Sequence, residues 1–403
     1  MSNNNQTQEM FLPASNHMAL AMGPSHPATH GIVRFNLTLE GERIIKSTTD
    51  IGYLHRGFEK MVERSTWNQA IIYTDRLNYV SAMINNVGYC LAVEKLLDVE
   101  VPPRSVFLRV IMSELSRIAD HMTCVAAQVM ESGAMSAFLY CMKAREWLWE
   151  IVEMVCGARV TTNWTRIGGL MADVPQEFSD AVQIRIPKLR EVIEELDKLI
   201  TKNRIFYDRF RDIGSMTKEE AIDFGFTGPC LRATGVPFDV RRDSPYLNYD
   251  EFDFEIPIGT QGDVYDRYLM RMFEMEQSLQ IVEQALEKLP DGPVCVDDKN
   301  IVLPDKSAVY GSIEGLMNQF KLIMDDHGIQ PPAGEVYQAV EGANGELGFY
   351  VVSTGGDTPY KCRCRPPCFP MTAAMDKMIV GQLISDIVPI FGSINMIGGE
   401  LDR

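Results

Sequence analysis

The sequence predicts an α+β protein that is mainly α, with a bundle of long helices and small β-sheets near the N- and C-termini. Long stretches in the middle of the chain place apolar residues at helical spacing. A strand-like alternation follows His30, and a hairpin signal stands at Asn344-Gly345. Of the 403 residues, 46% are hydrophobic, which is ample for a large core.

The first sheet is expected in the N-terminal β part, residues 17–57. Apolar residues at positions 33, 35, 37 and 39 alternate with polar ones, which indicates a half-buried strand. A turn is expected at 40–43, and Ile44 begins the return strand. Residues 1–16 begin with the polar run MSNNNQTQEM and are interpreted as a flexible N-terminal arm.

Residues 58–330 are expected to form the helical bundle. Pro102-Pro103 is a helix start signal, and Thr217 with Glu220 matches a capping box. Pro187 predicts a start or a kink inside its helical stretch. The helices are expected at 105–131, 138–156, about 176–203, a short segment after Thr217, 264–289 and 312–326.

The C-terminal α/β part, residues 331–403, is expected to hold a second sheet. Strands are predicted at 335–340 and 348–352, joined around Asn344-Gly345, with a third at 361–365. A last helix is predicted at 371–387. The sequence contains no internal repeat, so residues 17–403 are expected to be a single domain.

Charge and cysteine usage narrow the class of protein. A net charge of −17 repels phosphate backbones, which argues against nucleic-acid partners. The nine cysteines, several in apolar helical surroundings, indicate reduced thiols in a cytosolic protein. The most apolar late stretch, 378–397, is interrupted by Gln382, Asp386 and Pro389, so no membrane-crossing segment is expected.

The segment HPATHG places His26 and His30 four residues apart. Zinc ligands on one helical face have this spacing, but Pro27 and the following strand argue against a helix. The alternatives are a loop that points polar groups into a cavity and a structural loop whose histidines cap the backbone.

The segment CRCRPPC holds Cys362, Cys364 and Cys368. Three thiols in seven residues resemble metal ligation, yet no matching Cys or His pair stands elsewhere at ligand spacing. The interleaved Lys361, Arg363 and Arg365 suggest instead a basic edge that meets a partner or solvent.

Two more segments are weak signals by themselves. Residues 51–59, IGYLHRGFE, are compatible with a strand-to-helix junction, and Asp75 and Arg76 of TDRLNY with a surface pair. The sequence holds no phosphate-binding P-loop and no convincing dinucleotide motif, so nucleotide binding by this chain is unsupported.

Taken together, the segments form an ordered set: HPATHG, IGYLHRGFEKMVE, TDRLNYV, LAVEKLL, SELSRIADH, SGAM, RIGG and GGELDR. This set closely resembles the D-subunit family of bacterial NADH:quinone oxidoreductase, respiratory complex I, from about Met22 to Arg403. That family is similar in fold to the large subunit of nickel–iron hydrogenases, which hold their metals with two C-x-x-C pairs. The equivalent segments here, 76–81 (RLNYVS) and 393–398 (SINMIG), contain no cysteine, so a hydrogenase-like fold without the metal site is expected.

The resemblance assigns roles to five residues. His30 and Tyr79 match the family's quinone-contacting histidine and tyrosine, which act as catalytic hydrogen-bond donors. Glu131 matches the position of an aspartate that orients the histidine. Arg76 matches an arginine beside the terminal iron–sulfur cluster of a partner subunit. Thr161 stands where many relatives have a histidine near that cluster, so the pH dependence which that histidine gives to the cluster potential is expected to be absent.

The function that the resemblance implies is a quinone-site subunit of proton-translocating NADH:quinone oxidoreductase. The chain is expected to bind no cofactor or metal itself, to receive electrons from partner subunits that carry FMN and iron–sulfur clusters, and to be inactive alone. It is expected to lie peripherally on the cytoplasmic face of the bacterial cell membrane, against the membrane arm. The alternative is a non-catalytic scaffold subunit of a hydrogenase-like membrane complex.

Overall fold

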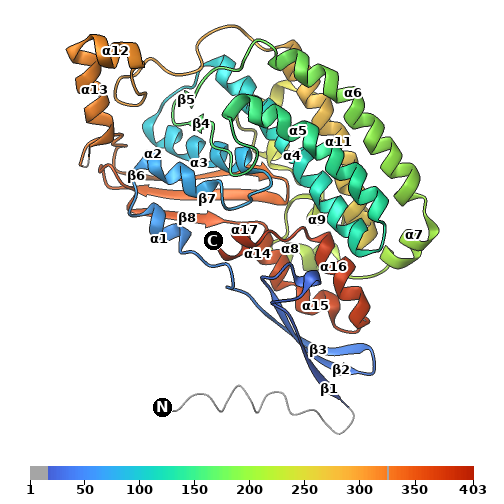
Figure 1. Cartoon of the computed structure of the whole chain (residues 1–403). Coiled ribbons are helices and arrows are strands. Elements are labelled where there is room, and N and C mark those ends of the chain that lie inside the picture. The colour runs from blue at the N-terminus through green and yellow to red at the C-terminus, as the bar shows by residue number, and fades with distance from the viewer. Residues whose placement is uncertain (1–16, 325) are drawn as a thin grey trace, which may run out of the picture.

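The computed structural model describes residues 17–324 and 326–403, so the predicted arm 1–16 lies outside the described residues. Long helices pack together on one side, a central sheet lies beside them, and a separate small sheet projects at the N-terminal end (Figure 1). The prediction of a mainly helical α+β fold with small sheets near both ends is confirmed.

The N-terminal sheet is antiparallel, in the order β1–β2–β3. Its strands are β1 (Met18–Met22), β2 (Arg34–Glu40) and β3 (Arg43–Asp50). The predicted alternation buries Phe35, Leu37 and Leu39 of β2. Sequence reasoning missed β1, which is an edge strand that buries only Met22 and therefore has no alternation to detect.

The bundle is built around α4, which packs against both α5 and α11. Its long helices are α3 (Ala82–Leu97), α4 (Pro103–Glu131), α5 (Met135–Cys156), α6 (Phe178–Leu196) and α11 (Val264–Glu287). The predicted start of α4 is confirmed, because Pro103 stands at its first position, where no backbone donor is needed. Pro187 lies inside α6, which continues into the π-helical turn η3 (Asp197–Thr201).

Short helices complete the bundle and its edges. The capping box predicted at Thr217 is present and opens α8 (Lys218–Asp223). The others are α1 (Phe58–Val62), α2 (Trp67–Thr74), α7 (Arg204–Phe210), α9 (Gly228–Arg232), α10 (Val240–Asp243), α12 (Lys306–Gly311) and α13 (Ile313–Ile323), with the two-residue strands β4 (Thr165–Arg166) and β5 (Gly169–Leu170) and the 3-10 helix η4 (Tyr249–Glu251).

The second sheet has the antiparallel order β6–β7–β8, and α3 packs against it. Its strands are β6 (Gly334–Gly342), β7 (Gly345–Ser353) and β8 (Lys361–Arg365). The predicted hairpin is confirmed: Gly342 pairs with Gly345 around the turn. Gly345 has a φ of 136°, a conformation that favours glycine.

The prediction of one last helix over 371–387 is wrong. The chain there forms α14 (Cys368–Ala373), α15 (Met375–Ile379), η5 (Ile384–Asp386), α16 (Ile387–Ser393) and α17 (Gly398–Asp402). Helix α15 ends because Val380 turns extended, with ψ of 130°, and Gly381 takes a φ of 87°. The apolar run is therefore a series of short buried helices, and no described helix is both long and apolar enough to cross a membrane.

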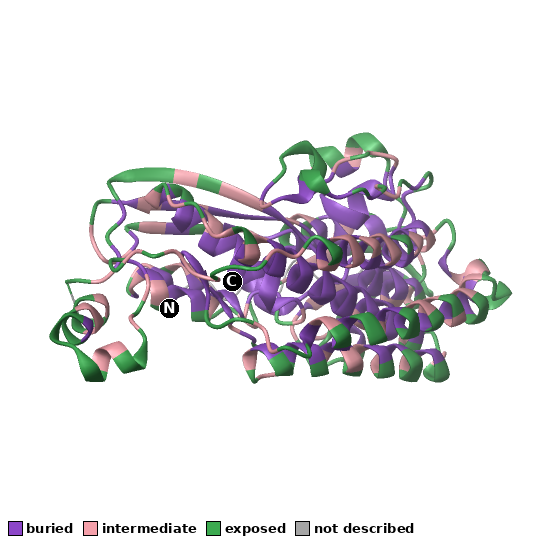
Figure 2. Ribbon diagram, turned by 90° about the horizontal axis from the view of Figure 1, so that it is seen from above, coloured by how far each residue is buried: buried purple, intermediate pink, exposed green. Residues whose placement is uncertain are grey.

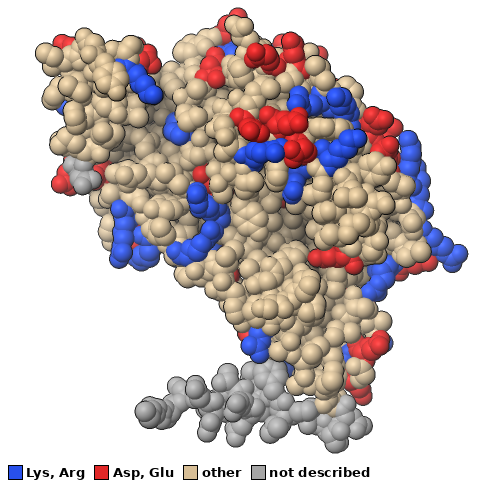
Figure 3. Space-filling model, viewed as in Figure 1, with Lys and Arg blue, Asp and Glu red and all other residues tan. Residues whose placement is uncertain are grey.

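The core lies between the bundle and the second sheet, while the outlying α12 buries none of its residues (Figure 2). On the face seen in Figure 3, acidic and basic side chains lie next to one another in the upper part, whereas the lower centre is largely uncharged.

Candidate functional site

The HPATHG loop gives its two histidines different tasks. His26 caps the 3-10 helix η2 (Pro27–Thr29), and its Nδ1 accepts a hydrogen bond from the Ala28 N–H at 3.2 Å. His30 follows η2 in the left-handed conformation, with a φ of 52°. The loop does not place both rings on one helical face, as the zinc interpretation requires. His26 takes the backbone-capping role, while His30 is free to face the bundle.

His30 lies against Glu131, the last residue of α4. Its Nε2 is 3.2 Å from Glu131 Oε1, although the two residues are 101 positions apart in the chain. The His30 ring also packs on Phe391 of α16, with ring centroids 5.3 Å apart. Gly392 leaves space for the carboxylate, because a Cβ there would stand 3.2 Å from Glu131 Oε2. The structure thus brings the predicted histidine and its predicted orienting carboxylate together.

Tyr79 lies in the loop between α2 and α3, on a backbone that its neighbours fix. Asn78 Nδ2 and Ser81 Oγ both donate to Asp120 Oδ2, at 2.7 and 2.8 Å. Asn78 Oδ1 also accepts from the Val80 N–H at 3.2 Å. Asn78 and Ser81 are buried, whereas Tyr79 is 40% exposed, so this loop presents the tyrosine at the surface of the chain. Desolvation, followed by the nearby Cys368 and Asp120, raises the pKa of the Tyr79 hydroxyl, which keeps it a neutral donor.

Asp120 also joins the two segments that stand in place of the hydrogenase C-x-x-C pairs. Asn395 of the second segment donates to Asp120 Oδ1 at 2.8 Å, opposite the bonds from Asn78 and Ser81 of the first. The groups that meet there are amides, a hydroxyl and a carboxylate. These nitrogen and oxygen groups do not suit a nickel–iron centre, which needs soft thiolate ligands.

Carboxylates of one helix therefore bind His30 directly and the neighbours of Tyr79 on either side. Asp120 and Glu131 are eleven residues apart on α4, which is close to three helical turns, so both carboxylates lie on the same face about 16 Å apart along the axis. Among the described residues, His30 and Tyr79 share no hydrogen bond with each other. Helix α4 sets the distance between them.

Arg76 lies beside the same loop and is partly exposed. Its Nη1 donates to the Ile72 carbonyl at 2.7 Å and lies 3.5 Å from Asp75 Oδ2. Burial raises the pKa of Asp75 to about 6, against the opposing effect of hydrogen bonds from Asn86 and Asn163. Because Asn163 Nδ2 also bonds Asp75, at 3.4 Å, the chain segment of Thr161 lies near that of Arg76.

Thr161 does not extend a side chain toward a neighbour. Its Oγ1 donates to the carbonyl of Val160 at 2.7 Å, and the residue is exposed. Its φ of 53° is unfavourable for a β-branched residue. Thr161 therefore lies near the loop of Arg76, and among the described residues its side chain makes no hydrogen bond beyond Val160.

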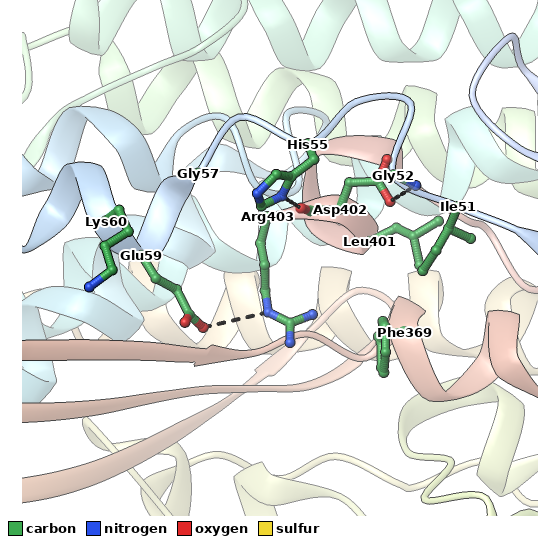
Figure 4. Close-up of a pocket in the computed structure, with 10 residues that line it drawn as sticks. All are labelled: Ile51, Gly52, His55, Gly57, Glu59, Lys60, Phe369, Leu401, Asp402 and Arg403. Carbon is green, nitrogen blue, oxygen red and sulfur yellow. Dashed lines mark hydrogen bonds and ion pairs between the residues drawn. The ribbon is translucent and has the colours of Figure 1, made fainter. Parts of the chain in front are cut away.

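The 51–59 segment forms one wall of a pocket of about 360 Å³ (Figure 4). The Asp402 carboxylate accepts from the N–H groups of Gly52 and Leu54 at 2.9 and 2.7 Å. His55 Nδ1 lies 2.6 Å from the Asp402 carbonyl, and Arg403 pairs with Glu59 at 3.6 Å. None of the five predicted site residues lines this pocket. Asp402 and Arg403 of the C-terminal GGELDR segment therefore bind residues 51–59, a segment that is a weak signal by itself.

The remaining candidate metal ligands are three buried thiols and three carboxylates that pair with arginines. Cys362, Cys364 and Cys368 are fully buried, and burial raises the pKa of the Cys362 thiol to about 12. Asp239, Glu274 and Glu341 form a carboxylate group within 4.8 Å, which is paired with Arg232 and Arg241. Those guanidinium groups already supply the positive charge that a cation would provide.

Known proteins resemble this chain over nearly its whole length. The family model described as "Respiratory-chain NADH dehydrogenase, 49 Kd subunit" matches residues 131–403. The D 1 subunit of NADH-quinone oxidoreductase from Sorangium cellulosum (strain So ce56) is 53% identical over 396 residues, which cover 98% of this chain and 97% of that protein. The D subunit from Myxococcus xanthus (strain DK1622) is 50% identical over 386 residues, covering 96% and 92%.

A third relative has a compound name. The C/D subunit of NADH-quinone oxidoreductase from Bdellovibrio bacteriovorus is 47% identical over 387 residues, and the match covers 96% of this chain but 69% of that protein. The chain belongs to the family of the 49 kDa subunit of the respiratory-chain NADH dehydrogenase, the D-subunit family of complex I.

Proposed function

We propose that the chain lines the quinone-reducing site of a proton-translocating NADH:quinone oxidoreductase, with His30 and Tyr79 as the donors to the quinone. The observation that carries the proposal is the 3.2 Å contact between His30 and Glu131, two residues paired by the family resemblance and far apart in sequence. The relatives' names, as subunits of NADH-quinone oxidoreductase, support the reaction class.

The donor types suit the chemistry. Quinone takes up two electrons and two protons, and its carbonyl oxygens gain negative charge as the electrons arrive. A histidine held by a carboxylate can donate a hydrogen bond to one oxygen. The Tyr79 hydroxyl stays protonated, because its pKa is raised, and can donate to the other oxygen. Both donors stabilise the reduced quinone more than the oxidised one.

Electrons are proposed to reach the quinone from an iron–sulfur cluster held by a partner subunit, which receives them from NADH through FMN. Partly exposed Arg76 is suited to face that cluster, where a fixed cation favours the reduced form. The chain is proposed to sit peripherally on the cytoplasmic face of the membrane, where the reaction is coupled to a membrane arm. The compound name of the Bdellovibrio relative supports a C-type subunit as one neighbour.

The test uses the assembled complex in membranes. His30→Ala and Tyr79→Phe should each lower kcat/KM for quinone about ten- to hundredfold, while NADH oxidation by a soluble acceptor that bypasses quinone stays unchanged. His327→Ala and Tyr310→Phe are matched controls, because both residues are exposed elsewhere on the chain. Unchanged quinone reduction in both site variants would overturn the proposal.

A further inference from the structure

A chain of buried polar groups runs from Asp120 behind Tyr79 to a second carboxyl group, Glu400 of α17. Asn395 Nδ2 donates to Asp120 Oδ1 at 2.8 Å and to Asn344 Oδ1 at 2.5 Å. Asn344 Nδ2 in turn donates to Glu400 Oε2 at 3.4 Å, and the Cys368 N–H donates to Glu400 Oε1 at 3.3 Å. The two carboxyl groups thus stand at opposite ends of a chain of two amides.

The hydrogen-bonded chain from Asp120 to Glu400 contains two acidic groups and no basic group. Asp120 and Glu400 are both buried, and neither has a Lys, Arg or His within ion-pair distance among residues 17–324 and 326–403. Two unpaired buried carboxylates in one network are strongly unfavourable, so one of them holds a proton. Asp120 accepts hydrogen bonds from Asn78, Ser81 and Asn395, whereas Glu400 accepts from Asn344 and the Cys368 N–H.

Glu400 is the group that carries the proton. The titratable groups that face it are Asp120 of α4 and the Cys368 thiol of α14, with the Cys364 thiol of β8 beyond. Helices α14 and α17 pack together next to the end of β8 (Figure 1). Burial, reinforced by the charge of Asp120, raises the pKa of the Glu400 carboxyl to about 7, although the Cys368 N–H opposes the rise.

We propose that Glu400 is a further positioning residue of the quinone site, and that its neutral carboxyl group maintains the Asn344–Asn395–Asp120 chain which holds Tyr79 in place. The inference rests on the proposed function, because it assigns Glu400 a role in presenting a quinone donor. Loss of the Glu400 proton puts a second negative charge into the chain. The two carboxylates then repel each other across the two amides, and this repulsion weakens the hold of Asp120 on the Tyr79 loop.

The test is the pH dependence of quinone reduction by the assembled complex. Wild type should show a KM for quinone that rises about tenfold between about pH 6 and about pH 8, with kcat changing less. Glu400→Gln, which mimics the neutral acid, should keep the low-pH KM throughout this range. Glu400→Asp should retain the rise, and Glu191→Gln, an exposed glutamate of α6, should behave as wild type. An alkaline rise in KM that is the same in Glu400→Gln as in wild type would overturn the inference.

Infrared spectroscopy gives a second measurement if Glu400→Gln does not assemble. The wild-type complex should show the C=O band of a protonated carboxyl group that disappears near neutral pH and shifts in Glu400→Asp. No such band, or one that Glu400→Asp leaves in place, would contradict the proposal. The two proposals fail separately: normal quinone reduction by both His30→Ala and Tyr79→Phe removes the quinone site, whereas defective site variants beside an unchanged Glu400→Gln profile remove only the role of Glu400.

Discussion

Helix α4 carries two sets of charged side chains that differ in their surroundings. In its middle, Glu114 and Arg117 belong to a fully buried ionic cluster. At its C-terminal end, Glu131 contacts His30, and 13% of the Glu131 side chain and 32% of the His30 side chain are exposed. The Glu114 carboxylate accepts hydrogen bonds from Arg117, Arg241, Tyr249 and Ser278. Glu131 has one contact, and its Oε2 is buried without a hydrogen-bond partner among the described residues.

The difference separates a structural role from a functional one. A carboxylate that is saturated with donors and shielded from water has no capacity left for a ligand, and its loss weakens the fold. A carboxylate with a single bond to a partly exposed histidine retains that capacity, and its loss weakens a site. We therefore expect variants in the middle of α4 to affect folding and variants at its end to affect quinone reduction.

The largest expected effect comes from breaking the buried cluster. Arg241 donates to Asp239, Glu114 and Glu274, at 2.7, 3.2 and 2.9 Å. Arg241→Met leaves these carboxylates without one of their cations and should lower the free energy of unfolding of the purified chain by about 3–5 kcal/mol, measured in urea. Arg185→Met breaks a partly exposed pair with Glu150 and should change it by less than about 1 kcal/mol. Equal losses in both variants would contradict the comparison.

Glu400 should show the next largest effect, as a dependence of stability on pH. Its pKa rises from 4.5 to about 7 in the folded chain, so the neutral acid is favoured by folding. Below about pH 4.5 the acid is neutral in both states, and Glu400→Gln should match wild type. Above about pH 7 the folded wild type holds a charged carboxylate, and Glu400→Gln should be more stable by about 3 kcal/mol. Urea unfolding at several pH values measures this difference, and parallel curves would contradict it.

Much of the fold was predictable because local patterns agree with the packing. The period of two at β2, the glycine of the hairpin turn and the helical spacing of α4 each match one element. The end of the chain was not predictable, because most of its apolar residues from 371 onward are buried, and Val380 and Leu383 are among the few exposed ones. Such a run gives little sign of where short helices stop, although Gly381 marks one break.

The site was predictable in part, for a similar reason. His30 and Glu131 come from sequence motifs, and their contact follows once α4 and η2 meet α16. Asp120 lies inside the quoted motif SELSRIADH, yet its role depends on Asn78 and Asn395 from two distant segments. Asp120 is one of several charged residues on α4, so the local sequence neither singles it out nor identifies its partners.

Glu131 tests the functional half of the comparison. Glu131→Gln keeps the size of the side chain but removes the charge that orients His30, so kcat/KM for quinone should fall about tenfold. The unfolding free energy should stay within about 0.5 kcal/mol of wild type, because the group is partly exposed and makes one contact. Glu131→Asp should give a kcat/KM between those of wild type and Glu131→Gln, because its shorter side chain must still reach His30 Nε2, which lies 3.2 Å from Glu131 in the wild type. A loss of stability as large as that of Arg241→Met would remove the distinction between the middle and the C-terminal end of α4.

The smallest expected effect concerns Thr161, where the backbone and not the charge is at issue. Its φ of 53° is costly for a β-branched side chain, which among the described residues bonds only the carbonyl of Val160. Asn tolerates this conformation, so Thr161→Asn should raise the unfolding free energy by about 1 kcal/mol. Thr354→Asn is a suitable control, because Thr354 is likewise exposed and has no positive φ. Lower stability in Thr161→Asn would mean that the threonine side chain makes a contact worth more than the strain of its backbone.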